Sequence, residues 1–461
     1  MTPITLEELA RAVGCAAPAT STPEIRGVSI DTRTVNPDDA FFAMPGARVD
    51  PHDLLPDAVA AGAVVVVAER DVPDIGIPVL RVTDAQAALG QLGHWYWRDR
   101  LDCTTVGITG SSGKTTTKDL IAQILEAAGP TVSPRGSFNT EVGVPLTILS
   151  ADAATRFLVL EMGMRGLGHI EHLTRIATPD IAVVTNVGHA HVELLGSIDQ
   201  IAVAKGELVA GLNPRGTAVL NADDPRVLAM RERTTASILT YGRAEDADLR
   251  AQDIQVGRNS VDFHVVDQRA GAECTVHLAY VGEHNVFNAL AALGAALACG
   301  ASLADAAHAL GNARPRSAMR MEMLTAPGGF LVINDAYNAN PESTKAALSA
   351  LAAMEGRTWA VLGEMRELGP ESAALHAEVG RWAGHVGIDR LLCVGEGTRP
   401  AHEAASASGV ESLWLPDADD AVAALSSELG SGDVVLVKAS RSIGLERIVQ
   451  ALMAPTGGGA A

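Results

Sequence analysis

Aromatic residues are scarce in this chain, where they make up 3% of 461 residues. A core with so few rings has to be packed mainly from Ala, Val, Leu and Ile, and the hydrophobic content of 47% is large enough for that. Charged residues make up 20%, which is ordinary for a soluble globular protein. At roughly 150 residues per domain, a chain of this length predicts about three domains.

Cysteine is scarce as well, and its spacing carries no metal or disulfide pattern. The five cysteines are scattered, without a Cys-x-x-Cys pair, at Cys15, Cys103, Cys274, Cys299 and Cys393. This spacing favours buried free thiols in a reducing cytosol. The first residues lack the basic start and apolar run of a signal peptide, and no apolar stretch is long enough to span a bilayer. We therefore expect a cytoplasmic protein without membrane insertion.

Positive charge is in deficit, because 35 Lys and Arg residues stand against 55 Asp and Glu residues, which gives a net charge of -20. Such a balance excludes a general affinity for nucleic acid or for an anionic membrane. It does not exclude an anionic small molecule, because a local cluster of donors can bind phosphate on an acidic protein.

The chain divides into three segments with different patterns. Residues 1–83 mix short apolar runs with turns. Residues 84–314 open with a helical stretch and then alternate strands with helices, which predicts a mostly parallel sheet covered by helices, with an antiparallel addition at about 249–278. Residues 315–455 alternate again, as in a smaller Rossmann-like unit, and residues 456–461 are expected to be disordered. We predict an α/β protein whose three domains are these segments.

The strongest signal is a glycine-rich loop between an apolar strand and a helix. It comprises Gly110, Ser111, Ser112, Gly113, Lys114, Thr115 and Thr116. Small residues let backbone N–H groups approach phosphate oxygens, and the helix N-terminus adds a partial positive charge. Lys114 would reach the terminal phosphates and the Thr115 hydroxyl would bind Mg²⁺. Because Ile108 stands where the standard motif has its first glycine, the alternative is a chance Gly-Lys-Thr, which the flanking strand and helix disfavour.

Two further candidates follow neighbouring strands. Glu161 ends the strand RFLVLE, where a carboxylate is placed to hold Mg²⁺, and a solvated strand-end glutamate is the alternative. His191 follows IAVVTNVG, together with Asn186, His189 and Glu193. The His-Ala-His pair raises the possibility of zinc, but no Cys or further His lies at useful spacing, and a phosphate site prefers a hard cation. We predict His191 as a single nitrogen ligand of Mg²⁺, with a structural histidine as the alternative.

A series of motifs in one order resembles the Mur ligase family. They are TGSSGKTT, LEMG, NVGHAHVELLGS, AVAKGE, GEHNVFNALAA and INDAYNANPES. The resemblance covers nearly the whole chain. It implies an ATP-dependent amide ligase of peptidoglycan precursor synthesis. It also implies a first domain for a UDP-sugar, a central domain for ATP and a Rossmann-like C-terminal domain.

The resemblance implies roles for the metal site. Lys114 would bind the β- and γ-phosphates. Thr115 and Glu161 would hold one Mg²⁺, and Glu161 and His191 would help to hold a second. Lys205 matches a lysine that CO₂ carbamylates in this family, which turns a cation into an oxygen ligand for Mg²⁺ and requires a depressed pKa. The helical pattern around Lys205, taken alone, indicates only a solvated charge.

The resemblance also implies residues that bind the nucleotide. They are His284, Asn285, Asn288, Arg320, Asp335, Tyr337 and Asn338. Arg320 matches the arginine that approaches the γ-phosphate from the start of the third domain. Asp335 would bind the ribose hydroxyls, and Tyr337 and Asn338 would flank the adenine. For the group that begins with His284, helix capping by Asn285 is the alternative.

The other substrates are assigned by the same resemblance. The implied contacts are Ser29, Asp31, Thr32 and Arg33 with the uridine diphosphate, Asn139 and Thr140 with the UDP-sugar, and Lys438 and Arg441 with the carboxylate of a dipeptide. The stretch Asp-Thr-Arg-Thr equally suits a turn with local capping bonds. Lys438 and Arg441 equally suit solvated surface charges.

Three third-domain motifs indicate which member of the family is closest. INDAYNANPES, LGEMRELG and LVKASRSIGLE resemble the member that adds D-alanyl-D-alanine to UDP-MurNAc-tripeptide, and the D-N-P-R of the ligase for the third amino acid is absent there. The implied monomer would form an acyl phosphate and release ADP and phosphate. The alternatives are a ligase that adds one amino acid, and a nucleotide-switched interaction protein, against which the first domain and Lys205 speak.

Overall fold

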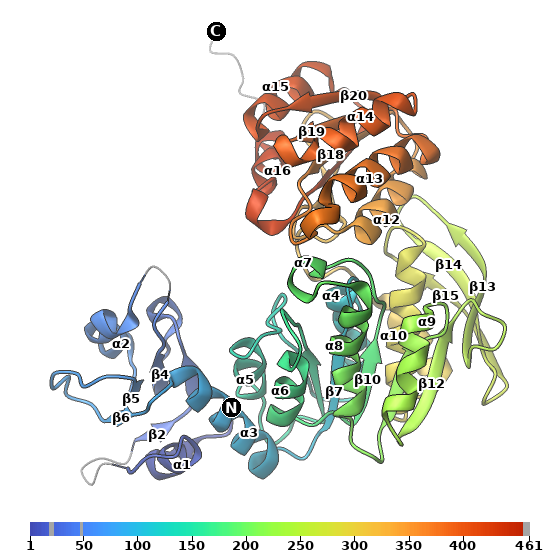
Figure 1. Cartoon of the computed structure of the whole chain (residues 1–461). Coiled ribbons are helices and arrows are strands. Elements are labelled where there is room, and N and C mark those ends of the chain that lie inside the picture. The colour runs from blue at the N-terminus through green and yellow to red at the C-terminus, as the bar shows by residue number, and fades with distance from the viewer. Residues whose placement is uncertain (18–22, 47–48, 455–461) are drawn as a thin grey trace.

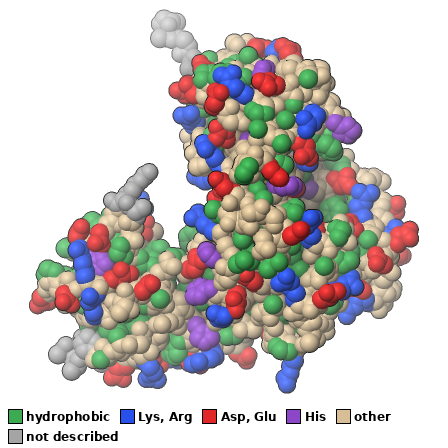
Figure 2. Space-filling view, viewed as in Figure 1, with side chains coloured by type: hydrophobic (Ala, Val, Ile, Leu, Met, Phe, Trp, Pro, Cys, Tyr) green, Lys and Arg blue, Asp and Glu red, His purple; other side chains and the backbone are tan. Residues whose placement is uncertain are grey.

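The computed structural model describes residues 1–17, 23–46 and 49–454 as an N-terminal, a central and a C-terminal α/β unit (Figure 1). The tail expected at 456–461 lies outside the described residues. On the face shown in Figure 2, acidic side chains are interspersed with Lys and Arg, and the surface is hollowed between the N-terminal unit and the rest. The negative charge is therefore not gathered into one patch on that face.

The N-terminal unit is built on a parallel four-stranded sheet of order β3-β4-β5-β6, beside an antiparallel pair of β1 and β2. Strands β4 and β5 are buried along their whole length, as their sequences DAFFA and VVVA require. The elements are β1 (Ile4–Thr5), α1 (Leu6–Ala12), β2 (Glu24–Ile25), β3 (Gly27–Ser29), β4 (Asp39–Ala43), α2 (Leu55–Ala61), β5 (Val65–Ala68) and β6 (Val79–Arg81).

The central unit is a nine-stranded sheet of order β15-β14-β13-β12-β11-β10-β7-β9-β8. Its strands are β7 (Thr104–Thr109), β8 (Thr131–Val132), β9 (Phe157–Glu161), β10 (Ile181–Val184), β11 (Thr217–Asn221), β12 (Ser237–Gly242), β13 (Leu249–Val256), β14 (Val261–Asp267) and β15 (Ala272–Leu278). The strands from β8 to β13 pair in parallel, whereas β14 and β15 are antiparallel. The antiparallel addition predicted from sequence is therefore confirmed.

Helices cover this sheet, and their bounds agree with the predicted alternation. They are α3 (Ala85–Arg100), α4 (Lys114–Glu126), α5 (Gly143–Ile148), α6 (His169–Ile176), α7 (Val192–Leu195), α8 (Ile198–Ala210), α9 (Pro225–Leu228), α10 (His284–Ala298) and α11 (Leu303–Asn312). One buried apolar cluster continues from the N-terminal unit through α3 to strands of the central sheet.

The C-terminal unit is a six-stranded sheet of order β16-β17-β21-β18-β19-β20, parallel except for β16. Its elements are β16 (Glu322–Thr325), β17 (Leu331–Asp335), α12 (Pro341–Ala352), β18 (Thr358–Gly363), α13 (Ser372–Val386), β19 (Arg390–Val394), α14 (Arg399–Ala407), β20 (Glu411–Leu415), α15 (Ala418–Glu428), β21 (Val434–Lys438) and α16 (Glu446–Met453). The edge strands β16 and β20 were not predicted, because neither carries a continuous buried run.

Carboxyl ends of neighbouring parallel strands bring the predicted site together. Strand β7 lies between β9 and β10, with Ile108 opposite Glu161 and Thr109 opposite Val184. The loops that follow these strands therefore leave the sheet at one edge. This edge faces the C-terminal unit across α7 and α10 (Figure 1).

The five tryptophans lie outside the nine-stranded sheet. They are Trp95 and Trp97 in α3, and Trp359, Trp382 and Trp414 in the C-terminal unit. Trp359 is 1% exposed, and the guanidinium carbons of Arg357 and Arg390 lie 4.8 and 5.0 Å from its ring centroid. The core of the central unit is accordingly packed mainly from aliphatic side chains.

All five cysteines are free, but only Cys393 is buried and the others are half-buried, which corrects the expectation of buried thiols. Burial raises the pKa of Cys103 to about 11 and that of Cys299 to about 12, so both stay protonated at neutral pH. Across the described residues, no helix has the length and apolar character to pass through a bilayer.

Candidate active site

A cavity of about 1440 Å³ lies between the edge of the central sheet and the C-terminal unit. Its walls include the glycine-rich loop, Glu161, His191, Lys205 and the first residues of α10, opposite residues of the linker and of β17. All the site residues predicted from sequence line this cavity except Ser29, Asp31, Thr32, Arg33 and Arg441. Segments far apart in the sequence therefore meet at one site.

The glycine-rich loop needs its glycines for close approach. A Cβ on Gly110 would lie 1.8 Å from the Thr185 hydroxyl oxygen. Gly113 caps α4 with φ +78°, and its Cβ would lie 2.4 Å from Oδ1 of Asn288. Lys114 begins α4, and its Nζ donates to the Gly110 carbonyl at 2.7 Å. The loop therefore curls around its own lysine at the start of a helix, which is the geometry of a phosphate site.

Glu161 is held by two donors at the end of β9. The Thr115 hydroxyl donates to its Oε2 at 3.0 Å, and Nδ2 of Asn139 donates to its Oε1 at 2.7 Å. The carboxylate is only 1% exposed, which rules out the solvated alternative. Thr115 and Glu161 present oxygen atoms side by side, as a hard cation prefers.

No group of three or more His, Cys, Asp and Glu side chains arranged as metal ligands occurs in residues 1–17, 23–46 and 49–454. A cation between Thr115 and Glu161 would therefore complete its shell with phosphate oxygens, water or the atoms of a modified side chain.

Lys205 is buried in α8 with 2% exposure, so the pattern-based expectation of a solvated charge was wrong. Burial, together with the nearby charge of Lys114, holds the pKa of Lys205 well below its usual value. Within the described part of the chain, no carboxylate forms an ion pair with it. The shift favours the uncharged amine.

His191 faces the C-terminal unit, and its own backbone is left-handed, with φ +68°. Its Nδ1 contacts a carboxylate oxygen of Glu367, whose carbonyl accepts from the Glu193 N–H at 3.1 Å. Burial lowers the pKa of His191, while Glu367 opposes that shift. Glu367 lies in the stretch LGEMRELG, but nothing local in that stretch indicated a partner for a histidine of the central unit.

Asp335 and Lys438 lie opposite each other at the ends of β17 and β21. Nζ of Lys438 donates to Oδ2 of Asp335 at 2.6 Å and to the Asn338 carbonyl at 2.9 Å. Lys438 is 3% exposed, so the alternative of a solvated surface charge was wrong for this residue. Burial lowers the pKa of nearby His284 to about 4. These groups form one polar wall of the cavity.

Arg320 stacks on Tyr337, with its guanidinium carbon 4.2 Å from the ring centroid. Its neighbours Met319 and Met321 both have left-handed backbones, with φ +58° and +51°. Non-glycine residues rarely adopt this conformation, so the chain turns sharply on each side of Arg320. The side chain is thereby presented to the cavity.

Asn285 does not cap α10, since its Nδ2 donates to the Val281 carbonyl at 2.8 Å, and the capping alternative was wrong. Its Oδ1 accepts from Nδ2 of Asn288 at 2.8 Å, while the Thr117 hydroxyl donates to Oδ1 of Asn288 at 3.3 Å. Asn285 and Asn288 are therefore hydrogen-bonded to each other, and Asn288 packs against Gly113 and accepts from Thr117 of α4.

The predicted uridine diphosphate stretch forms a local turn. Asp31 caps the 3-10 helix η1 (Thr32–Thr34), accepts from the Arg33 N–H at 3.0 Å and pairs with the Arg33 guanidinium at 2.6 Å. Hydrogen bonds from Arg33 lower the pKa of Asp31 to about 2. The predicted local capping bonds are therefore present, while the contact with uridine diphosphate stays a prediction. Arg441, also outside the cavity lining, pairs with Glu446 at 2.9 Å.

Lys118 and Asp119 form a buried pair on α4 that was not predicted from the sequence, and their charged atoms lie 2.7 Å apart. Lys118 also donates to the Pro134 carbonyl at 2.8 Å, and Asp119 accepts from the Ser317 hydroxyl at 2.6 Å. These bonds tie α4 to the linker that precedes Arg320. The only local signal was that Lys118 lies one helical turn after Lys114, on the same face.

Family models match along most of the chain. The model of the Mur ligase family, catalytic domain, matches residues 24–96. The Mur ligase middle domain matches residues 108–296, and the Mur ligase, glutamate ligase domain, matches residues 319–441. Each match contains one of the three larger sheets or most of its strands.

Individual relatives are similar over nearly their full length. UDP-N-acetylmuramoyl-tripeptide--D-alanyl-D-alanine ligase of Mycobacterium tuberculosis is 41% identical, over 93% of this chain and 92% of the relative. MurF from Acinetobacter baumannii has a TM-score of 0.88 and 31% identity, over 98% and 99% of the two chains. MurF ligase from Thermotoga maritima in complex with ADP has a TM-score of 0.79 and 30% identity, over 93% and 97%. The chain belongs to the Mur ligase family.

Proposed function

We propose that this chain uses ATP to join D-alanyl-D-alanine to UDP-N-acetylmuramoyl-tripeptide, giving the pentapeptide precursor of peptidoglycan, ADP and phosphate. The observation that carries the proposal is the meeting of Lys114, Glu161 and Lys205 with Arg320 and Asp335 in one cavity. Relatives that cover over nine-tenths of the chain bear the name of this ligase, and one of the similar structures contains ADP.

Lys114 and Arg320 would bind and orient the terminal phosphates, because both are cations on the cavity wall at the glycine-rich loop. Thr115, Glu161 and His191 would hold Mg²⁺. When bound, Mg²⁺ would neutralise charge on the phosphates. The peptide carboxylate would attack the γ-phosphate to form an acyl phosphate, which the dipeptide amine then captures. The residues contribute mainly position and charge.

Lys205 fits a carbamate. Its burial and its lowered pKa favour the uncharged amine that reacts with CO₂, and its place on the wall that carries Glu161 suits an added oxygen ligand. Asp335 would bind the ribose, with Tyr337 and Asn338 beside the adenine.

The remaining substrate contacts are proposals carried by the family resemblance. We propose that they are Ser29, Asp31, Thr32 and Arg33 for the uridine diphosphate, Asn139 and Thr140 for the UDP-sugar, and Lys438 and Arg441 for the dipeptide. One chain supplies both walls of the cavity, which supports a monomer. Free thiols and the use of ATP support a cytoplasmic enzyme.

The choice of amine tests the proposed function. With UDP-MurNAc-tripeptide and ATP, phosphate release is expected to be at least on the order of 10²-fold faster with D-alanyl-D-alanine than with single amino acids. A single amino acid would leave the polar groups that bind the second alanine unpaired. The control reaction offers a diamino acid and the UDP-MurNAc-dipeptide. Faster turnover there would assign the chain to the preceding step. Phosphate release that requires only a protein partner would indicate a switch.

A further inference from the structure

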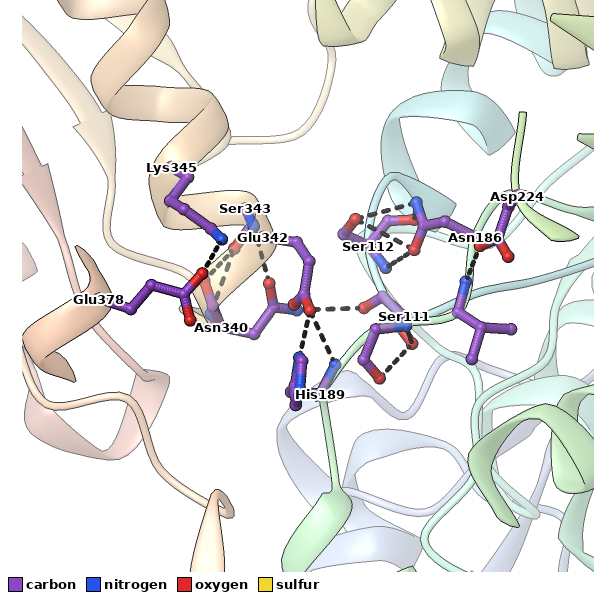
Figure 3. A network of polar contacts seen from close by, with 12 residues as sticks. Ser111, Ser112, Asn186, His189, Asp224, Asn340, Glu342, Ser343, Lys345 and Glu378 are labelled. Carbon is purple, nitrogen blue, oxygen red and sulfur yellow. Dashed lines mark hydrogen bonds and ion pairs between the residues drawn. The ribbon is translucent and has the colours of Figure 1, made fainter. Parts of the chain in front are cut away.

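A network of polar contacts joins the C-terminal unit to the glycine-rich loop (Figure 3). On the central side, the Ser111 hydroxyl donates to the Gly188 carbonyl at 3.1 Å and accepts from the Gly188 N–H at 2.8 Å. The Ser112 N–H donates to Oδ1 of Asn186 at 2.9 Å, and the Val187 N–H donates to Asp224 at 2.8 Å. Three of these hydrogen bonds join the glycine-rich loop directly to residues 186–188.

On the other side lies the first turn of α12. Oε1 of Glu342 accepts from the His189 N–H at 3.1 Å and lies 2.5 Å from Nδ1 of the same histidine. The N-cap residue Asn340 donates to the Ser111 carbonyl at 3.4 Å. Glu342 in α12 and the N-cap residue Asn340 thus contact His189 and Ser111, across sequence separations of 153 and 229 residues.

The Glu342 carboxylate packs directly against Gly188, where any larger residue would place a Cβ in the same space. A Cβ at that position would lie 2.6 Å from Cδ of Glu342 and 2.8 Å from both of its carboxylate oxygens. Oε2 of Glu342 is buried and has no hydrogen-bond partner among the described residues. A buried unpaired carboxylate oxygen is costly, so the contact to His189 is not explained by a local gain in stability alone.

We propose that Glu342 is a positioning residue. By holding the backbone and the ring of His189, it fixes the 186–191 segment, and through Ser111 the glycine-rich loop, whenever the C-terminal unit is seated as in this structure. The phosphate site is then complete only when the unit that carries Asp335 and Tyr337 is in place. The proposal rests on the proposed binding of ATP phosphates at this loop.

The experiment uses the full chain and three single variants. Glu342→Ala removes the carboxylate, and Gly188→Ala displaces it while leaving Glu342 present. Glu378→Gln is the matched control, because Glu378 of α13 accepts a hydrogen bond from Lys345 of α12 at 2.5 Å and, among the described residues, is not hydrogen-bonded to the central unit. Glu342→Gln, which keeps the side-chain length, serves if Glu342→Ala fails to fold.

Amide hydrogen exchange of residues 110–113 and 186–191 is the first measurement, since it does not depend on turnover. We expect exchange there to rise on the order of tenfold in both Glu342→Ala and Gly188→Ala, as the loss of a hydrogen bond to a charged group implies. Glu378→Gln should leave it unchanged. Unchanged exchange in folded Glu342→Ala would overturn the proposal, whatever the enzyme is found to ligate.

Kinetics provide the second measurement. In Glu342→Ala, kcat should fall on the order of tenfold, while KM for the UDP-linked substrate stays the same. In the double variant of Gly188 and Glu342, the loss should equal that of one single variant, because both remove one contact. Additive losses would show that the two residues act separately and would contradict the proposal. If the wild type does not ligate D-alanyl-D-alanine, the proposed function fails while the exchange result still decides the role of Glu342.

Discussion

Lys114→Ala is expected to reduce phosphate release on the order of 10²-fold or more while the chain remains folded, because a charge-assisted contact to the transferring phosphate is lost. In the structure, Nζ of Lys114 donates to the Gly110 carbonyl at the N-terminus of α4. Burial lowers the pKa of Lys114, so phosphate charge would favour its protonated form. The measurement is phosphate release with ATP and both co-substrates.

A matched control removes another lysine cation. Lys345 pairs with Glu378 and does not line the cavity, so Lys345→Ala should retain most of the turnover. Thermal unfolding of both variants checks that they are folded. Near-normal turnover by folded Lys114→Ala would refute the assignment of the glycine-rich loop to phosphate binding.

Lys205→Ala should also lose on the order of 10²-fold or more of the activity, and small carboxylates such as acetate should restore part of it. A bare ammonium at this buried position would be repelled by Lys114 and by a metal, whereas a carbamate would supply an oxygen ligand. Lys205→Arg should not be rescued, because arginine cannot form the carbamate and fills the space. Activity is measured with and without acetate, beside wild type depleted of CO₂.

A packing role for Lys205 makes a different prediction. Lys205→Met keeps much of the side-chain volume, so it would stay active if the lysine only filled space in α8. Full activity of Lys205→Ala without added carboxylate would likewise remove Lys205 from the metal site. Circular dichroism of each variant separates loss of chemistry from loss of fold.

The edge that carries the site could be predicted from sequence because its signals are local. Gly110 and Glu161 each lie at the end of an apolar run, and parallel strands deliver such ends to one edge of a sheet. The domain boundaries near residues 83 and 314 stay predictions, as do the two Mg²⁺ ions and the carbamate.

The rest of the site depends on packing between distant segments. His191 and Glu367 are 176 residues apart, and neither pattern nor spacing relates them. Lys205 has the local pattern of a surface residue, and only family resemblance indicated otherwise; its burial comes from the way α8 packs on the central unit. Edge strands such as β20 were missed because half of a short edge strand faces solvent and leaves no apolar run.

The placement of the tryptophans determines what fluorescence can report. Because Trp95 and Trp97 lie in α3 and the other three lie in the C-terminal unit, tryptophan emission originates where α3 packs on the central unit and in the C-terminal unit. Loosening of the nine-stranded sheet would reach that emission through Trp97, whose Nε1 donates to the Thr105 hydroxyl of β7 at 3.0 Å, whereas exposure of Trp359 to water would report on the C-terminal sheet. An optical unfolding curve of this protein therefore reports on the β7 side of the central sheet and on the C-terminal unit, and the far strands β13 to β15 need a backbone probe or an introduced tryptophan.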